Sequence, residues 1–323
     1  MKRLFGKLNN FFRKPFVYAA IFSLILTGCV GYSLLDVFVI PSYQTAVTYA
    51  KTNSYLVTGD TEETETEEDE TTEETEAETI ITDSTYSDEN ITITITTKVV
   101  NDTTVYICDI YCSIQYLQTA LANSTYGTNV TEKTSEIADS VGAILAINGD
   151  FYGANKKGYV IKNGVLYRDT VRSDSEYGDL VIYSDGSWDI IYEDEISAEE
   201  LMEDGVVQLF AFGPTLVYDG EIVVSGDDEV DRSMTNNPRT AIGIVEDGHY
   251  VFVVSDGRTD ESEGLSLYEL AQVLEDCGCT LAYNLDGGGS STLVFMGEVI
   301  NNPTTSGNSI KEREVSDIVY IGY

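Results

Sequence analysis

One short segment of the chain combines a carboxylate with a run of glycines. The octapeptide 284–291, Asn-Leu-Asp-Gly-Gly-Gly-Ser-Ser, places Asp286 directly after an apolar run, Thr280–Asn284, that is typical of a strand. Three successive glycines are costly in an ordered core, because glycine loses the most backbone entropy on folding. They suit a main chain that takes positive φ or lies against a ligand, where bare amides can hold an anion. The segment therefore predicts chemistry on a phosphorylated or strongly polar substrate, unless it is only a glycine-rich hairpin loop.

Other predicted strands also end in polar residues. An apolar strand over 251–255 leads into Asp256-Gly257-Arg258, and another ends at Asn148-Gly149-Asp150. Arg239 opens a third strand, in which apolar and other residues alternate. Strand ends in open α/β sheets converge on one rim. We therefore expect Asn148, Asp256 and Asp286 to lie close together.

The order of these motifs resembles the phosphodiester glycosidase family. The similarity extends from about Val141 to the C-terminus, and it rests on Asn148-Gly149 followed by aromatics, Phe212-Gly213-Pro214, Arg239-Thr240-Ala241-Ile242-Gly243, Asp256-Gly257, the predicted helix start 266–271, and 284–290. The resemblance implies an extracytoplasmic enzyme that hydrolyses a sugar joined through its anomeric carbon to a phosphodiester. Family members carry a small residue and then glycine before the aromatics, where this chain has Asp150. That departure implies a subgroup-specific substrate contact for Asp150 rather than a general catalytic role.

Asp286, Asp256, Asn148 and Arg239 are the candidate catalytic residues. Phosphate is already a competent leaving group, so the site mainly needs a base that activates water and positive charge beside the departing phosphate. Asp286 is predicted to be the base or nucleophile, and Asp256 the second carboxylate of the pair that glycosidases use. Asn148 would orient a sugar hydroxyl or the water. Each also has a structural explanation: a turn pair for Asp256, a core ion pair for Arg239 and a strand cap for Asn148.

The phosphate of the substrate is expected to bind at the glycine run. The candidate ligands there are Gly287, Gly288, Gly289 and Ser290, with Asp150 as a further contact. From Ile80 onward the chain has 42 acidic and 12 basic residues, so an anionic substrate needs local positive charge. Arg239 and Arg258 are the obvious sources of that charge.

The single histidine limits the chemistry that the chain can perform. His249 stands at the start of a predicted strand, far from the motif ends, so no serine–histidine triad or histidine-rich metal site can be built around it. The sequence requires no cofactor. A divalent cation such as Ca²⁺ is an alternative at the oxygen-rich loop 227–231, which holds Asp227, Asp228, Glu229 and Asp231, although its spacing lacks the EF-hand pattern and favours a solvated loop. The rival functions are a metal-dependent phosphodiesterase and a non-catalytic binder of envelope polysaccharide.

Charge excludes nucleic acid as a partner and predicts a linker. The chain of 323 residues has a net charge of −37, which repels nucleic acid and anionic lipid. The window Asp60–Thr79 holds 12 acidic residues and 8 Thr or Ala. Such a segment has nothing to bury and its charges repel one another, so it is predicted to be a disordered, extended linker.

The N-terminus predicts a single-pass membrane anchor. Basic residues in 1–15 precede an apolar run, 16–35, of about the 20 residues that a membrane span needs. Positive charge on that side alone predicts that 1–15 is cytoplasmic and the remainder extracellular. The sequence Leu26-Thr27-Gly28-Cys29 resembles a bacterial lipobox, so a lipoprotein anchored at Cys29 is the first alternative. A cleaved signal peptide is the second.

The rest of the sequence predicts an α+β domain over 80–323, which follows a stalk over 36–59 and the linker over 60–79. Short strands outnumber helices, which favours mixed, twisted β-sheets flanked by helices. The predicted strands include 90–100 and 103–112, joined by a two-residue turn, and single strands over 160–166 and 215–224. The predicted helices are 114–122, 135–140, 198–202 and 267–276, the last opened by a capping box between Ser266 and Glu269.

Four cysteines lie outside the apolar run. Cys108 and Cys112 fall in one predicted strand, and Cys277 and Cys279 near the end of the last helix. They allow three disulfide pairings, and the sequence leaves the choice among them open. Their spacing is poor for a tetrahedral zinc site, so buried thiols or a disulfide are expected.

Overall fold

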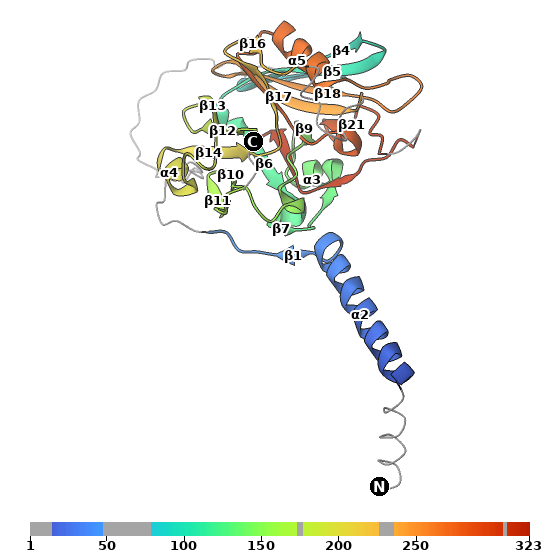
Figure 1. Ribbon diagram of the computed structural model, residues 1–323. Coiled ribbons are helices and arrows are strands. Elements are labelled where there is room, and N and C mark those ends of the chain that lie inside the picture. Colours follow the sequence, from blue (N-terminus) through green and yellow to red (C-terminus); the bar gives the residue numbers. More distant parts are fainter. Residues whose placement is uncertain (1–14, 48–78, 173–176, 226–235, 306–308) are drawn as a thin grey trace, which may run out of the picture. The chain divides into compact units, whose positions relative to one another are not determined.

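The computed structural model describes residues 15–47, 79–172, 177–225, 236–305 and 309–323 (Figure 1). The basic segment 1–14, nearly all of the acidic segment 60–79 and the acidic loop 227–231 lie outside these residues. The chain divides into two units, Met1–Ser42 and Tyr43–Tyr323, and each is described by itself.

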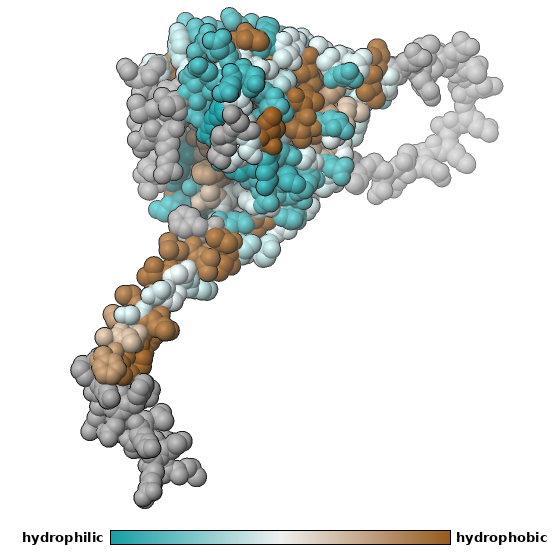
Figure 2. Space-filling model, turned by 90° about the vertical axis from the view of Figure 1, so that its right-hand side faces the viewer, coloured by the Kyte–Doolittle hydropathy of each residue, from teal (hydrophilic) through white to brown (hydrophobic). Residues whose placement is uncertain are grey.

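The first unit contains one apolar helix. Helix α2 spans Pro15–Phe38, and its segment Phe16–Asp36 has a mean hydropathy of 1.8 over a stretch of 21 residues. Figure 2 shows hydrophobic side chains covering much of its surface. The sequence prediction of an apolar run over 16–35 is confirmed, and the helix is long enough for either a signal sequence or a membrane anchor.

The second unit consists mainly of antiparallel β-sheets. The largest sheet has nine strands in the order β16 (Glu221–Ile222), β15 (Thr215–Tyr218), β19 (Leu281–Asn284), β17 (Arg239–Glu246), β18 (His249–Ser255), β5 (Thr103–Cys112), β4 (Ile91–Val100), β3 (Thr85–Ser87) and β2 (Ile80–Ile81). A five-stranded sheet has the order β21 (Glu298–Val299), β20 (Leu293–Phe295), β9 (Leu145–Asn148), β23 (Asp317–Ile321) and β6 (Leu117–Leu121).

Smaller elements complete the unit. A three-stranded sheet has the order β13 (Trp188–Ile191), β12 (Asp179–Tyr183) and β14 (Val206–Phe210). Two-stranded sheets are β10 (Val160–Lys162) with β11 (Val165–Arg168), and β22 (Glu314–Val315) with β8 (Glu132–Lys133); β1 (Ser42–Tyr43) and β7 (Gly127–Thr128) are also short strands. The helices are α3 (Thr134–Ser140), α4 (Ala198–Glu203) and α5 (Leu267–Asp276), with short 3₁₀ turns η1 (Ile114–Tyr116), η2 (Ala122–Ser124), η3 (Tyr152–Ala154) and η4 (Gly288–Ser290).

The fold is therefore mostly β with few helices. The expected excess of strands over helices is confirmed, but the sheets are not mixed, because every pairing within the nine-, five- and three-stranded sheets is antiparallel. The capping box between Ser266 and Glu269 is confirmed at the start of α5.

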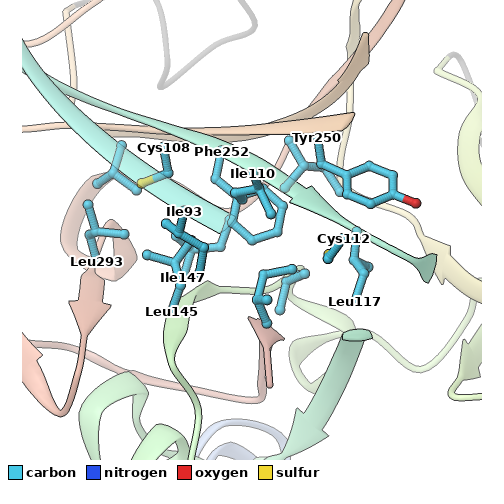
Figure 3. Packing of buried hydrophobic residues seen from close by; sticks show 14 of the residues in the cluster. Ile93, Cys108, Ile110, Cys112, Leu117, Leu145, Ile147, Tyr250, Phe252 and Leu293 are labelled. Atoms are coloured by element: carbon cyan, nitrogen blue, oxygen red, sulfur yellow. The ribbon is translucent and has the colours of Figure 1, made fainter. Parts of the chain in front are cut away.

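The main hydrophobic core lies between the nine-stranded and five-stranded sheets. Tyr250 and Phe252 of β18 point into this core, while Val251 and Val253 point to the opposite face, under α5. This alternation follows from the two-residue period of a strand. Figure 3 shows Phe252 and other side chains of the nine-stranded sheet packed against Leu145 and Leu293 of the five-stranded sheet. Burying each such side chain contributes roughly 1.5–3 kcal/mol.

Some predicted elements need correction. The helix expected over 114–122 is wrong: after the short turn η1, the chain forms β6, which pairs with β23 along its whole length. The strand expected over 160–166 is a hairpin, since Asn163 and Gly164 take positive φ values of 48° and 71° between β10 and β11. The strand expected over 215–224 is likewise a hairpin, β15–β16. The turn at 101–102 is confirmed, with φ values of 45° and 54°.

Antiparallel pairing brings the motif ends together. Strands β18 and β19 both pair antiparallel with β17 and therefore run in the same direction. Asp256 and Asp286 follow them, so both residues lie where these strands end, on the same side of the sheet. Arg239 begins β17 on that same side, because β17 runs in the opposite direction. Asn148 ends β9 of the other sheet, and its side-chain Nδ2 donates to the carbonyl oxygen of Asp286 over 2.6 Å. The predicted convergence of the strand ends is confirmed, although the sheet is antiparallel.

Candidate active site

The Asp286 carboxylate lies at the centre of a small polar cluster. Its Oδ2 atom accepts a hydrogen bond from Ser290 Oγ over 2.6 Å and from an Arg313 guanidinium nitrogen over 2.9 Å. The side chain of Asp286 is 13 % exposed, so a substrate can reach it. Burial raises the pKa of Asp286 above its ordinary value, and Arg313 and Ser290 oppose this rise without cancelling it. A carboxylate with a raised pKa is a better base near neutral pH than an ordinary one.

The glycine run is needed for close packing against protein atoms. A Cβ on Gly288 would lie 2.8 Å from the guanidinium of Arg258, and one on Gly289 would lie 2.6 Å from Thr305 Oγ1. Gly288 also has a φ of 61°, which favours glycine. The amides of Gly288 and Ser290 donate to the carbonyl oxygens of Pro238 and Gly287, over 2.7 and 3.3 Å. Those two amides already have hydrogen-bond partners within the protein. Positive charge beside the glycine run therefore comes from side chains.

Two arginines provide that charge. Arg258 holds a positive φ of 61°, which is uncommon for a residue with a side chain. It donates to neutral acceptors, Asn237 Oδ1 at 2.9 and 3.1 Å and the Thr305 carbonyl oxygen at 2.7 Å. Burial, and then the nearby charge of Arg313, lower the pKa of Arg258 from its high ordinary value. Of these two arginines, only Arg313 forms an ion pair with a carboxylate in the described part of the chain. The glycine run therefore has excess positive charge beside it.

Asn148 and Arg239 lie beneath the cluster and are engaged with the protein. Asn148 is fully buried: besides its bond to Asp286, its Oδ1 accepts from Thr240 Oγ1 over 2.8 Å. Arg239 is 5 % exposed, and its Nε donates to the Leu265 carbonyl oxygen over 2.9 Å. Asn148 thus joins the two large sheets behind Asp286. The Arg239 side chain packs beneath the loop that begins at Gly287.

The two remaining predicted residues are also buried. Asp256 is 2 % exposed and accepts from the Asn302 amide over 2.7 Å and from the Asn302 side chain over 3.0 Å. Asn301, the residue before Asn302, donates to the Ser291 carbonyl oxygen over 3.0 Å. Asp256 therefore holds a segment that in turn holds the end of the glycine loop. Asp150 accepts from the Tyr152 amide and lies beside buried Lys162 rather than at the surface. Of the predicted residues, Arg258 is therefore exposed, and Asp286 and Gly287 are partly exposed. Gly288, Gly289 and Ser290 are buried next to them, and the other four lie beneath or behind this group.

A cavity of about 500 Å³ adjoins this cluster. It is lined by residues of polar and charged types, whose aliphatic stems also contribute to its wall: Lys133, Thr305, Ser309, Lys311, Glu312, Arg313 and Glu314. Arg313 belongs both to the cavity wall and to the Asp286 cluster, and Thr305 accepts a hydrogen bond from Arg258. The cavity is thus continuous with the candidate site.

Sequence analysis missed three residues of this region, Arg313, Lys162 and Asp317. Arg313 stands in a run of alternating charge, Lys-Glu-Arg-Glu over 311–314, which resembles an ordinary solvated segment. Asp317 opens an apolar strand and is fully buried, so an acidic residue at the head of a buried strand was the available signal. Lys162 offered a similar signal at the end of the apolar strand β10.

Other candidate groups lie elsewhere. His249 is at the opposite end of β18 from Asp256, stacked on Tyr111 and bonded to Asp109 over 2.6 Å. The described residues contain no cluster of three or more His, Cys, Asp or Glu that could hold a metal ion, and the acidic loop 227–231 lies outside them. All five cysteines are free thiols, and burial raises the pKa of Cys112 to about 12.

Comparison with known proteins identifies relatives of the C-terminal part of the chain. The SPbeta prophage-derived uncharacterized protein YomE of Bacillus subtilis is 32% identical over 204 residues, which cover 62% of this chain and 31% of that protein. The N-acetylglucosamine-1-phosphodiester alpha-N-acetylglucosaminidase of Homo sapiens is 30% identical over 189 residues, covering 54% of this chain and 35% of the relative. The chain thus spans about a third of the length of these curated relatives.

Solved structures show the same fold. The catalytic domain of the zebrafish N-acetylglucosamine-1-phosphodiester alpha-N-acetylglucosaminidase, auto-inhibited by its pro-peptide, has a TM-score of 0.58 and 22% identity, over 72% of this chain and 83% of that one. A hypothetical protein from Synechocystis has a TM-score of 0.51 and 16% identity, over 72% of this chain and 62% of that one. Residues 141–322, more than half of the chain, match the phosphodiester glycosidase family itself. The chain belongs to the phosphodiester glycosidase family.

Proposed function

We propose that the C-terminal part of this chain hydrolyses the glycosidic C1–O bond of a sugar-1-phosphodiester. Membership of the family supports a hydrolase of this class. The observation that carries the proposal is the Asp286 carboxylate, which is partly exposed, has a raised pKa and binds the guanidinium of Arg313. The guanidinium of Arg258 lies against Gly288 of the same loop. A base and an anion-binding charge in one place are the two requirements of this reaction.

In the proposed reaction, water attacks the anomeric carbon while Asp286 accepts one of its protons. The C1–O bond breaks, and its electron pair leaves with the phosphate oxygen. The products are the free sugar and the phosphate monoester of the other substituent. Asp256 is bonded to Asn302 and lies away from the surface, so we assign a single carboxylate to the chemical step. A mechanism with one base and no covalent intermediate inverts the anomeric configuration.

Arg258 and Arg313 are proposed to bind the phosphate and to stabilise it as it departs. A guanidinium presents two parallel N–H groups to phosphate oxygens, which suits this role. The role is also an electrostatic necessity, because a chain with a net charge of −37 repels an anionic substrate everywhere else. Charge pairing with Asp286 would hold Arg313 near the base until the substrate arrives.

We further propose that the enzyme acts at the cell surface, on a glycosyl-phosphate saccharide of the envelope or of an exopolysaccharide. Helix α2 supports an anchored protein, since it has the length and hydropathy that a membrane span requires. The charged and hydroxyl-bearing residues that line the cavity beside Arg313 support a substituent on the phosphate that carries hydrogen-bonding groups.

Product analysis tests the proposal. The purified protein is incubated with the methyl phosphodiester of N-acetylglucosamine 1-phosphate, since relatives of this chain are named for that sugar. Release of free N-acetylglucosamine and methyl phosphate supports the proposal. Release of N-acetylglucosamine 1-phosphate and methanol would indicate a phosphodiesterase, and binding without turnover would indicate a polysaccharide-binding protein.

A further inference from the structure

A buried lysine joins two buried carboxylates behind the candidate site. Lys162, at the end of β10, is 2 % exposed, and its Nζ lies 2.9 Å from Asp317 Oδ2 and 3.2 Å from Asp150 Oδ2. The ammonium group also lies over the ring of Phe210, 4.1 Å from its centroid. Two carboxylates and one cation in a dry site are costly to bury, and removing one partner of such a set is strongly destabilising. In some proteins such a set fixes one particular arrangement of the chain.

The two carboxylates differ in their remaining contacts. Asp150 accepts hydrogen bonds from the backbone amides of Tyr152, over 3.0 Å, and Ala211, over 3.2 Å. Asp317 is fully buried, and Lys162 is its ion-pair partner. Its carboxylate instead packs against Gly149, where an added Cβ would lie 2.5 to 2.7 Å from three of its atoms.

Gly149 connects this set to the candidate base. Its amide donates to the backbone carbonyl oxygen of Asp317 over 2.9 Å, and its own carbonyl oxygen accepts from the Asp286 amide over 3.3 Å. Asn148, the preceding residue, holds the Asp286 carbonyl oxygen. The peptide groups on both sides of Asp286 are therefore held by the dipeptide 148–149, whose position depends on Asp317 and Asp150.

We propose that Lys162, Asp150 and Asp317 form a positioning triad that aims Asp286 through Gly149, and that Asp317 places a titratable charge behind the base. The proposal rests on the proposed function, because Asp286 is the base of that reaction. Lys162 acts through Gly149 and Asp286, so it is a positioning residue and does not touch the substrate.

The charges around Asp317 give the triad a measurable signature. Burial raises the pKa of Asp317 to about 7; Lys162 opposes the rise, and the charges of Asp150 and Asp286 add to it. Coupling between two ionisable groups is mutual, so ionisation of Asp317 also makes Asp286 more basic. Arg313 and Ser290 contact Asp286 directly, whereas Asp317 acts on it only through its charge. We therefore expect the environment of Asp286 to change near pH 7, in addition to the titration of Asp286 itself.

Two variants test the triad. Asp317→Asn keeps the shape that packs against Gly149 but removes the titration. The double variant Lys162→Met with Asp317→Asn removes one cation and one anion together, so the triad keeps its net charge and the chain has a better chance to fold than with Lys162→Met alone. Asp179→Asn is the control, since Asp179 is an equally buried acid that pairs with Arg172 instead.

The readout combines NMR and kinetics on the full chain. The carboxyl ¹³C signal of Asp286, assigned with Asp286→Asn, should show a second inflection near pH 7 in the wild type and in Asp179→Asn, but not in Asp317→Asn. The double variant should lower kcat by about tenfold or more while KM changes by less than about twofold, since a displaced base affects the chemical step. An inflection that survives in Asp317→Asn, or a double variant with the kcat of the control, would overturn the triad. If the wild type does not turn over the diester, the proposed function fails, and the NMR titration still decides the inference.

Discussion

Arg313 donates to Asp286 Oδ2 over 2.9 Å from a position 27 residues further along the chain. The contact joins the strand end that carries the carboxylate and the glycine run to a segment with no recognisable pattern. It also places the cation where a phosphate and a base would meet.

Asp286→Asn should abolish turnover while the protein stays folded. The substitution is nearly isosteric and keeps one acceptor oxygen, which can serve both Ser290 and Arg313, but it removes the basicity. We expect kcat to fall by about 10²–10⁴-fold, the range for loss of a general base. Steady-state kinetics and a melting curve check this, with Asp109→Asn as the control, because the Asp109 side chain bonds to His249 at the far end of β18 from Asp256. Wild-type kcat in Asp286→Asn would contradict the assignment.

Arg258→Lys should weaken substrate binding. A lysine ammonium is a point charge and cannot copy the two-pronged contact of a guanidinium with phosphate oxygens. We expect KM to rise by about tenfold, equivalent to about 1.4 kcal/mol of lost binding. The rise should shrink at high salt, where charge contributes less.

Arg239→Lys is the matched comparison for that experiment. Arg239 is buried and donates to the Leu265 carbonyl oxygen, so its loss should lower the melting temperature and leave KM nearly unchanged. A large KM effect at Arg239 with none at Arg258 would place the phosphate elsewhere.

Stability should fall as the pH rises, because of a second buried acid. Burial raises the pKa of Asp179 to about 9; Arg172 opposes the rise and Glu193 adds to it. The ordinary pKa of an aspartate is about 3.9, so between about pH 4 and pH 9 the folded protein binds more protons than the unfolded chain. That contribution to stability is full below about pH 4 and is lost as the pH rises through 9. Urea unfolding at several pH values should show a smaller decline in Asp179→Asn than in the wild type; equal slopes would contradict this.

Helix α2 should remain in the mature protein as an anchor. Protease treatment of intact cells should then release a fragment that begins in the acidic segment 60–79, where charge and lack of apolar residues favour an accessible chain. Mass spectrometry of the membrane-bound remainder gives its N-terminus. A mature N-terminus at an acylated Cys29 would support the lipoprotein instead, and a soluble protein without α2 would support a cleaved signal sequence.

Local patterns predicted the strands better than their arrangement. The alternation of apolar residues over 90–100 specified β4, and the two-residue turn after it specified the hairpin, because both signals lie within one short window. The segment 114–122 was misread as a helix, since a short apolar run fits either period and pairing with β23 decided the outcome. That pairing partner lies about 200 residues away, beyond the reach of any local pattern.

The candidate site likewise contains residues that a local motif reveals and residues that only the tertiary fold brings together. Asp286 and the glycine run were found because the motif is contiguous, and antiparallel pairing then brought Asn148, Asp256 and Arg239 to the same edge. Asp150 was expected to meet the substrate, but the structure places it against Lys162, twelve residues away in the chain. Arg313 was missed for the complementary reason, since only the tertiary fold brings its charge to Asp286.

Hydrolysis in ¹⁸O-labelled water tests the central claim most directly. Free sugar and phosphate monoester can arise from attack at carbon or at phosphorus, and only the position of the label separates the two routes. We expect ¹⁸O to enter the anomeric hydroxyl of the sugar and to be absent from the phosphate, as mass spectrometry of both products at early times would show. Label in the phosphate would mean that the P–O bond breaks, and the glycosidase assignment would be wrong even if Asp286 proved essential.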